Sequence, residues 1–555
     1  MADIDKQIYR LNTSLAFIVI LFSILLVRGI YLVTEQRTFL LKENDRRVQK
    51  TKVIPAFRGM ILDRNGLPIA MSKVSYTLSV DPSKTQFNAN AAGRIADILH
   101  LNPAEVISAT GDKTRKYKII SRDVSVSARE HLKGIKGLNF EQRETRLYPL
   151  ADSAAALIGL VNRSLSGTHG VEVFYDKQLK GTDGEYVYEV DAKNHIVGPR
   201  KVRKSEVDGQ DVRLTIDSKL QSGVYHTLKH AANKYEARGG VALILHVSTG
   251  ELLAAVNYPS FNPNEPITSF NKIKKNFLIA SRYEPGSTIK PIWMAWLLDK
   301  GYVSPKDTIS TSPGMMRIEN AVIKDTRDFG TLSLADIIRK SSNIGMAKLV
   351  EDLPYQIVEK MMIDMRLSHH YTIGLPGEVS GEVNPIISQS QFAKLSSAFG
   401  YGIAVTPLEL ARAYNIICNR GVDHPPKILL RQKNKKERVL SEESANQVIE
   451  MLKGVVKDGT GRRAKIPGIN VAGKTGTSHK LTHGIYKENE HRASFVGFVP
   501  AEKPKYLVLV MLDDPQGKWH YGGTSAAPLF ANIMDHVLSY DIRLKGYSSL
   551  YGTDK

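Results

Sequence analysis

The first pattern along the chain is an unbroken apolar run close to the N-terminus. Residues 14–33 form a stretch of about 20 positions with a single charge, Arg28, and such a stretch is long enough to span a bilayer as a helix. A cleavable signal peptide would need a shorter apolar core and a small-residue cleavage site, which Thr34-Glu35-Gln36-Arg37 does not supply. The pattern predicts an uncleaved transmembrane anchor over residues 14–33, after a leader over residues 1–13.

After the anchor the pattern changes to short segments. Residues 35–50 are charged and prone to form a helix, whereas residues 74–80 alternate apolar and polar positions, as strands do. Asn65-Gly66 is a turn signal before that strand. Short helices and further strands are expected beyond it, and no catalytic set of side chains stands out. We therefore predict a stalk and a non-catalytic pedestal domain over residues 34–210.

From residue 211 onward the pattern is that of an α/β protein. It predicts an amphipathic helix over residues 218–235 and a buried hairpin with strands over residues 240–247 and 251–258. Further helices are predicted over residues 288–300, 333–352, 390–398, 407–420 and 526–540, and a strand over residues 505–512. The predicted domain covers residues 211–540, and a short polar tail over residues 541–555 follows it.

Composition adds a strong positive charge. The 555 residues are enough for two or three domains, and the net charge of +20 suits nucleic acid, an anionic membrane surface or an acidic polymer as a partner. Because Cys418 is the only cysteine, no intramolecular disulfide is possible. It lies in an apolar run, where a buried role is expected.

Charge also bears on the orientation of the anchor. The lysines and arginines before the span are Lys6 and Arg10, and those shortly after it are Arg37, Lys42, Arg46, Arg47 and Lys50. This count favours a cytoplasmic C-terminal side, but large domains translocate with little regard to charge. Arg28 can either reach the nearby interface with its long side chain or contact a partner helix.

Candidate chemistry begins at Ser287-Thr288-Ile289-Lys290, which places a hydroxyl and a lysine on one face of a predicted helix start. Pro285-Gly286 ends the preceding element, so Ser287 lies at the positive end of that helix. Such a tetrapeptide alone is common by chance. Two further motifs follow it, Ser341-Ser342-Asn343 and Lys474-Thr475-Gly476-Thr477, and the three in this order are typical of serine β-lactamases and penicillin-binding proteins.

The residue types in these motifs suit acyl transfer. A serine hydroxyl is a weak nucleophile until a neighbour takes its proton. Lys290 can take it only if burial or a second cation lowers its pKa, and Lys474 is the candidate second cation. Ser341 can relay a proton, and Asn343 can hold Lys290 or a substrate amide in place.

The third motif is expected to bind substrate. Gly476 lets a substrate backbone lie against the strand, because no side chain blocks it. Lys474, Thr475 and Thr477 offer charge and hydroxyls to a substrate carboxylate. Backbone N–H groups of Ser287 and Thr477 are the expected oxyanion hole.

A cluster of histidines follows the third motif. His479, His483 and His491 follow no common pattern of metal ligands, so a solvated loop is the simpler interpretation and no metal site is predicted.

The motifs resemble those of class B penicillin-binding proteins, specifically the division-type (FtsI-like) septal peptidoglycan D,D-transpeptidases. Further matching segments are residues 58–70, 146–149, 157–159, 170–172, 175–176, 258–259, 374–378, 401–407 and 521–528. One departure is His246-Val247-Ser248 before Thr249-Gly250, where the family usually has an Asp-Pro pair. The resemblance implies an N-terminal transmembrane helix, an α+β pedestal (dimerisation-type) domain and a C-terminal α/β serine transpeptidase domain. That last domain is penicillin-binding/β-lactamase-like, with a central antiparallel sheet flanked by helices.

The resemblance also implies a reaction. Ser287 would attack the carbonyl between the terminal D-alanines of a donor stem peptide, the last D-alanine would leave, and a neighbouring stem-peptide amine would resolve the acyl-enzyme. β-Lactams would acylate the same serine, and no cofactor is needed. The implied partners are lipid-linked and nascent peptidoglycan, the membrane, a membrane-embedded glycosyltransferase and other division proteins, but no nucleic acid. Because this substrate lies outside the inner membrane, we expect a periplasmic catalytic domain despite the charge count.

Three alternatives remain open. The first is an elongation-type class B transpeptidase, although Ser72 and Asp81-Pro82 look more like the septal branch. The second is a membrane-bound β-lactam sensor or β-lactamase, against which the short leader and the long pedestal argue. The third is a division scaffold that has lost catalysis, which would have no reason to keep all the catalytic residue types.

Overall fold

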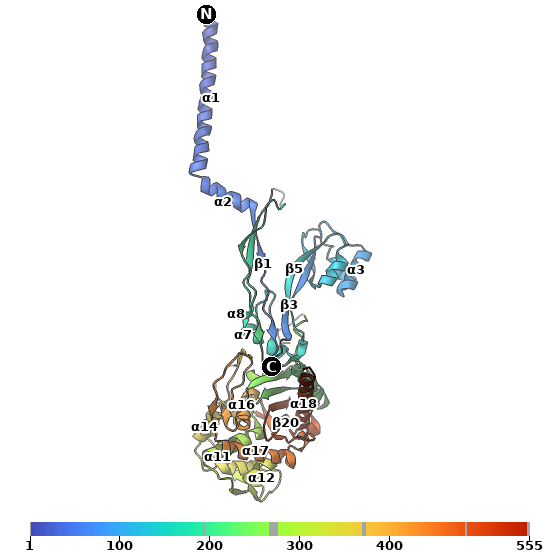
Figure 1. The fold of residues 1–555 in the computed structure, drawn as a ribbon, viewed down its shortest axis with the longest axis vertical. Helices are drawn as coiled ribbons and strands as arrows, with labels where there is room; N and C mark the ends of the chain where they lie inside the picture. Colours follow the sequence, from blue (N-terminus) through green and yellow to red (C-terminus); the bar gives the residue numbers. More distant parts are fainter. Residues whose placement is uncertain (1, 192–194, 266–275, 369–372, 483–484, 552–555) are drawn as a thin grey trace. The chain divides into compact units, whose positions relative to one another are not determined.

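The computed structural model describes residues 2–191, 195–265, 276–368, 373–482 and 485–551 (Figure 1). The chain forms two compact units. The first consists of Met1–Phe57 with Gly181–Gly209, and the second of Arg58–Lys180 with Gln210–Lys555. Both units take residues from the segment predicted as stalk and pedestal.

The first unit contains the membrane anchor and a small sheet. Helix α1 (Ala2–Thr34) is apolar and long enough to cross a membrane and has no buried residues, so it fits a single-pass anchor. The predicted charged helix is α2 (Arg37–Val48). Three antiparallel strands follow in the order β1-β6-β7, namely β1 (Gln49–Ile54), β6 (Gly184–Glu189) and β7 (Lys201–Lys204).

The second unit opens with the pedestal sheet. Its strands are β2 (Ile61–Leu62), β3 (Pro68–Val80), β4 (Lys118–Val124), β5 (Leu138–Leu147) and β8 (Val212–Arg213), with the order β4-β3-β2-β8 and β5 paired to β3. The predicted turn at Asn65-Gly66 joins β2 to β3, and Gly66 has the positive φ of +86° that such turns need. Apolar side chains of β3 pack with the helices α3 (Ala89–Leu99), α4 (Pro103–Ser108) and α5 (Val126–Leu132).

A buried ion cluster joins distant parts of the pedestal. Glu172 accepts hydrogen bonds from Arg58 at 2.8 Å and from Arg146 at 2.7 Å, and all three side chains are almost fully buried. Arg58 also binds Asp176 at 2.7 Å. Because each buried charge is stable only while its partners are present, the cluster fixes how these segments pack.

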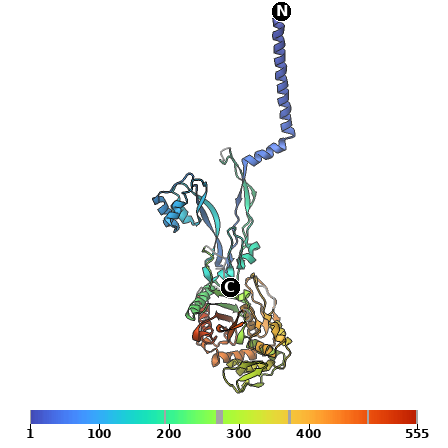
Figure 2. The ribbon, with the colours of Figure 1, turned by 180° about the vertical axis from the view of Figure 1, so that it is seen from behind.

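The catalytic part of the second unit is a five-stranded antiparallel sheet in the order β10-β9-β21-β20-β19. Its strands are β9 (Gly239–His246), β10 (Glu251–Tyr258), β19 (Ala472–Thr482), β20 (Ile485–Val499) and β21 (Tyr506–Asp513). Helices α9 (Ser218–Lys234) and α18 (Ala526–Tyr551) pack on one face, and Figure 2 shows the same sheet from behind. Helices α11 (Lys290–Asp299), α16 (Pro407–Cys418) and α17 (Glu442–Lys457) belong to the core on the other face. The predicted fold class is confirmed.

The remaining elements are short. The helices are α6 (Ala155–Ile158), α7 (Gly170–Phe174), α8 (Asp176–Leu179), α10 (Phe277–Ala280), α12 (Leu334–Lys340), α13 (Asn343–Val350), α14 (Gln356–Asp364) and α15 (Gln391–Ser397). The two-stranded pairs are β11 (Thr308–Ser310) with β14 (Thr331–Ser333), β12 (Met315–Ile318) with β13 (Ala321–Lys324), β15 (Glu382–Val383) with β16 (Ile403–Ala404), and β17 (Val422–Asp423) with β18 (Glu437–Arg438).

Two predicted boundaries were wrong. The helix expected over residues 333–352 is broken into α12 and α13, because Ser341 has a φ of +62° and ends the first helix. The helix expected to end at residue 540 continues to Tyr551, so most of the predicted tail is helical. Residues 552–555 of that tail lie outside the described part of the chain.

Candidate active site

Ser287 lies where the sequence predicts it, at the start of a helix. A 3₁₀ turn (Gly286–Ile289) leads directly into α11, whose first residue is Lys290. Gly286 has a φ of +54°, and a Cβ there would come within 2.9 Å of the Thr477 carbonyl oxygen. Glycine is therefore required for this turn to lie against β19. The turn is fixed further by the Thr288 hydroxyl, which donates a 2.7 Å hydrogen bond to the Pro285 carbonyl.

The Lys290 amino group is fully buried and held by three oxygens. It donates to the Ser341 carbonyl at 2.7 Å, to Asn343 Oδ1 at 2.7 Å and to Ser341 Oγ at 3.2 Å. Burial first, and then the charge of Lys474, lower the pKa of Lys290 well below its ordinary value. A lysine in this state can accept a proton, as the sequence requires of a catalytic base. Within the described residues, no hydrogen bond joins it to Ser287, and such bonds often form only when substrate is present.

The second motif is a sharp break between two helices. Ser341 ends α12 in the left-handed conformation, and the Ser342 hydroxyl caps α13 by accepting from the Gly345 N–H at 2.8 Å. This break directs Ser341 and Asn343 towards Lys290.

Asp325 anchors this break, and the sequence reasoning missed it. Its carboxylate accepts from the Ser342 hydroxyl and the Asn343 N–H, both at 2.5 Å, and from the Ile344 N–H at 3.2 Å. Its charge also favours the protonated form of Lys290, which opposes the effect of burial on the pKa. No motif marks Asp325 in the sequence, because its role depends on contacts that only the folded chain brings together.

Lys474 closes the cluster from the edge strand β19. Its Nζ donates to Ser341 Oγ at 2.9 Å and to the Thr475 carbonyl at 3.0 Å, and its side chain is fully buried. Burial lowers the pKa of Lys474 to about 7. Ser341 therefore lies between the amino groups of two lysines, an arrangement through which a proton can pass.

The remaining residues of the third motif follow the alternation of β19. The Thr475 hydroxyl shares a 2.8 Å hydrogen bond with Thr460, and the Thr477 hydroxyl accepts from the Gly522 N–H at 3.0 Å. A Cβ on Gly476 would lie 2.5 Å from Ser494 Oγ and 2.8 Å from the Thr288 side chain. Gly476 therefore allows β19 to pack closely against the turn that carries the nucleophile.

A cavity of about 600 Å³ borders the cluster. Asn343 and Lys324 line one part of it, and the aromatic rings of Tyr401 and Tyr486, 5.6 Å apart, line another. Tyr486 also donates a 2.9 Å hydrogen bond to the buried Glu284, which lies three residues before Ser287. The cavity can take an extended substrate next to the candidate base.

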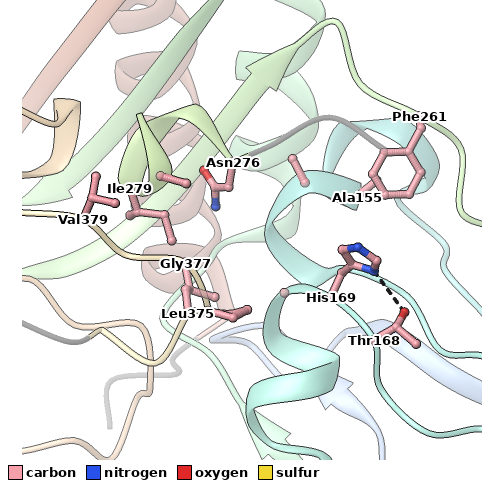
Figure 3. A pocket seen from close by; sticks show the side chains of 13 residues that line it. Ala155, Thr168, His169, Phe261, Asn276, Ile279, Leu375, Gly377 and Val379 are labelled. Carbon is pink, nitrogen blue, oxygen red and sulfur yellow. Dashed lines mark hydrogen bonds between the residues drawn. The ribbon is translucent and has the colours of Figure 1, made fainter. Parts of the chain in front are cut away.

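A second cavity, of about 500 Å³, lies between pedestal and catalytic segments of the same unit. Figure 3 shows His169 and Thr168, joined by a 3.0 Å hydrogen bond, on one side of it and Leu375 and Ile279 on another. Burial lowers the pKa of His169, so its imidazole is neutral at pH 7. None of the lining residues belongs to the catalytic cluster.

The other candidate side chains do not belong to the catalytic cluster, although His479 lines the cavity next to it. The rings of His479 and His491 are tilted by 44° with their centroids 4.7 Å apart, and the described residues contain no group of side chains suited to a metal. His483 lies outside the described residues. Cys418 is buried as predicted, and burial raises the pKa of its thiol, so it is an unreactive core residue.

Comparisons with known proteins agree with this geometry. Residues 240–535 match the family described as "Penicillin binding protein transpeptidase domain", and residues 53–214 match "Penicillin-binding Protein dimerisation domain". The chain is 32% identical to peptidoglycan D,D-transpeptidase FtsI of Escherichia coli, over 94% of this chain and 90% of that one. It is also 32% identical to the probable peptidoglycan D,D-transpeptidase PbpC of Pseudomonas aeruginosa, over 95% of this chain and 94% of that one.

Solved structures show the same fold. Penicillin binding protein 3 of Mycobacterium tuberculosis, complexed with aztreonam, superposes with a TM-score of 0.68 at 26% identity and covers 88% of this chain and 97% of its own. Penicillin binding protein 2X of Streptococcus thermophilus superposes with a TM-score of 0.71 at 24% identity, and the match covers 88% of this chain and 80% of that one.

Proposed function

The chain belongs to the class B penicillin-binding proteins, a group of peptidoglycan D,D-transpeptidases, and on that basis we propose that it cross-links septal cell wall through an acyl-enzyme on Ser287. The observation that carries the proposal is the chain of hydrogen bonds from Lys290 through Ser341 to Lys474, next to the half-buried Ser287. The same arrangement supports an active enzyme over a division scaffold without catalysis.

Acylation begins with proton transfer. Neutral Lys290 takes the proton of the Ser287 hydroxyl as the oxygen attacks the carbonyl between the two terminal D-alanines of the donor stem peptide. The N–H groups of Ser287 and Thr477 stabilise the oxyanion that forms. As the peptide C–N bond breaks, the departing D-alanine amine receives a proton through Ser341, and an ester on Ser287 remains.

Substrate binding uses the edge strand β19. Because this strand is the last in the sheet order, a donor peptide can lie alongside it as an additional strand. The terminal carboxylate is then bound by the ammonium of Lys474 and the hydroxyls of Thr475 and Thr477.

Deacylation reverses the proton path. The amine of a neighbouring stem peptide attacks the ester and loses a proton to Lys290, and the Ser287 oxygen leaves and regains that proton. A cross-link forms between the two peptides and the free enzyme returns. β-Lactams, which bind relatives such as the aztreonam-complexed and ampicillin-complexed mycobacterial proteins, acylate the same serine.

We place the catalytic domain in the periplasm, with α1 as a single-pass anchor in the inner membrane. This is where a peptidoglycan substrate lies, and large domains cross despite an unfavourable charge count. The partners in this scheme are lipid-linked and nascent peptidoglycan, a membrane-embedded glycosyltransferase and other division proteins. A septal role is supported by the near full-length likeness to FtsI of Escherichia coli.

Labelling with a fluorescent penicillin tests the catalytic assignment. Wild type and Ser304→Ala, which changes an exposed serine, should carry a stable label, and Ser287→Ala should carry none. A label on Ser287→Ala would refute the nucleophile, and rapid loss of label from wild type would favour a β-lactamase. Depletion in cells should produce filaments, whereas round cells would favour the elongation-type alternative.

A further inference from the structure

The connection between β6 and β7 lies at the end of the first unit's sheet that the anchor enters. Figure 1 shows β1 continuing from α2, and the Val190 N–H donates a 2.8 Å hydrogen bond to Val48, the last residue of α2. Val190 forms a bridge with Ile196, and the Val197 N–H donates to the Glu189 carbonyl at 3.0 Å. Ile196 and Val197 are therefore level with the end of α2, and these two residues are called the tip.

These two aliphatic side chains are exposed. Ile196 is 50% exposed and Val197 is 60% exposed, although both follow a well-paired strand. Val202 in the same unit is exposed to a similar degree, but Ile196 and Val197 are adjacent to each other and lie beside the end of α2. The same geometry suits insertion into the boundary between head groups and acyl chains of a bilayer.

The sheet behind this tip has one cationic and aromatic face. Register places Lys50 beside Tyr188 and Lys52 beside Tyr186, and these side chains share a face because paired residues point the same way. The two tyrosine rings lie 5.7 Å apart, and the guanidinium of Arg200 lies 5.4 Å from the Tyr186 ring centre.

The acidic residues of the sheet lie elsewhere. Within the described residues of β1, β6 and β7, the carboxylates are Glu185 and Glu189, and alternation places both on the opposite face. At the tip, Asp191 is paired with His195 at 3.1 Å. The face with Lys50 and Tyr188 therefore presents positive charge next to tyrosine rings, the combination enriched at membrane interfaces.

The orientation of α2 sets how far Ile196 and Val197 lie from the bilayer. The 12 residues of α2 span about 18 Å along the helix axis, and because the hairpin is hydrogen-bonded to Val48 at the end of α2, the two side chains lie at the head groups when α2 lies along the membrane surface. The first turn of α2 favours that position, because Phe39, Leu40 and Leu41 are exposed consecutive apolar residues and basic residues follow them.

We propose that Ile196 and Val197, together with the cationic face of the neighbouring sheet, form a second membrane contact, in which the two aliphatic side chains insert and Lys50 and Arg200 bind anionic phospholipid head groups. This contact would seat the first unit on the leaflet from which the anchor emerges, and it is independent of the catalytic assignment. Charge alone would also suit an acidic glycan strand, but a hydrated polysaccharide offers nothing to the exposed aliphatic pair.

Site-specific fluorescence tests the contact on the full chain. Because the single Cys418 is buried, a cysteine introduced as Val197→Cys can be labelled selectively with an environment-sensitive dye. Val126→Cys is the matched control, since Val126 is a similarly exposed valine in the pedestal. Both proteins are reconstituted into phosphatidylcholine vesicles with and without phosphatidylglycerol and probed with lipid-borne quenchers.

The label at position 197 should emit at shorter wavelength and be quenched by shallow lipid quenchers, more strongly with phosphatidylglycerol. Adding Lys50→Gln should weaken the part of the membrane response that depends on phosphatidylglycerol about fivefold. One basic residue near a charged membrane typically changes the binding affinity by about that factor. Equal emission and quenching at positions 197 and 126 in both vesicles would overturn the proposal. A response at position 197 that appears only on addition of uncross-linked glycan strands would overturn it as well, in favour of a glycan surface.

Discussion

Lys474 Nζ lies 2.9 Å from the hydroxyl of Ser341, across 133 residues of sequence. Lys290 Nζ also donates to this hydroxyl, so Ser341 Oγ is in contact with both lysines. The pair makes Ser341 a bridge between two buried lysines, through which protons would be exchanged in the proposed acylation of Ser287.

The rate of acylation should fall at both low and high pH, and the fall on the alkaline side should lie near pH 7. As the pH falls, Lys290 gains a proton and can no longer act as a base. As the pH rises through about 7, Lys474 loses the proton that gives it a charge for the substrate carboxylate. The measurement is the second-order rate constant for penicillin acylation against pH, and a rate that stays constant well above pH 7 would contradict the role of Lys474.

Lys474→Gln should shift the acidic limb of that profile upwards. The charge of Lys474 lowers the pKa of Lys290, so its removal raises that pKa and leaves less neutral base at pH 7. Loss of one acid–base or charge contribution of this kind typically costs about 10²–10⁴-fold in rate. The control is Lys457→Gln, which changes an exposed lysine on α17. An acidic limb that stays in place in Lys474→Gln would refute the coupling.

Asp325→Asn should slow acylation although Asp325 does not touch Ser287. The amide cannot accept all three hydrogen bonds that hold the break between α12 and α13, so Ser341 and Asn343 lose their position next to Lys290. We expect a loss of about 10–100-fold in acylation and about 1–3 kcal/mol in stability. Asp123→Asn, at an exposed ion pair, should change neither. Wild-type acylation kinetics in Asp325→Asn would remove its positioning role.

Gly476→Ala should separate β19 from the nucleophile turn. The new methyl group would lie 2.5 Å from Ser494 Oγ and 2.8 Å from the Thr288 side chain, which requires one of them to move. Overpacking of this kind lowers the free energy of unfolding by about 1–3 kcal/mol. The rate of acylation should also fall, because the turn that carries Ser287 is displaced. Adding Ser494→Ala removes the closest clash and should restore part of the thermal stability. If the double variant is no more stable than the single one, the clash is not the cause.

Glu172→Gln should destabilise the pedestal while leaving the catalytic chemistry of the folded protein intact. It removes the charge that two buried arginines, Arg58 and Arg146, share. Breaking a buried ion pair on one side typically costs about 3–5 kcal/mol. Denaturant unfolding should show this loss, and penicillin acylation below the transition should match wild type. Glu130→Gln, at an exposed pair, serves as the control.

Much of the candidate site could be predicted from local sequence. Pro285-Gly286 before Ser287 forces a helix start, and the serine and lysine one turn apart must then share a face. Asp325 could not be found in this way, because its contacts depend on a strand pair that turns back onto the α12–α13 break. The break itself was hidden by the helical periodicity of residues 333–352, which a single left-handed residue, Ser341, interrupts.

The apolar N-terminal helix, the order of the three motifs and the alternation of strands and helices can all be read from local sequence, because they depend on neighbouring residues and on the periods of helix and strand. The lowered pKa values of Lys290 and Lys474 and the position of Ser341 between them arise only in the folded chain. Those properties depend on burial and on distances of a few ångströms between segments remote in sequence. The free energy of a charged group depends on how far it is removed from water and on the charges close to it.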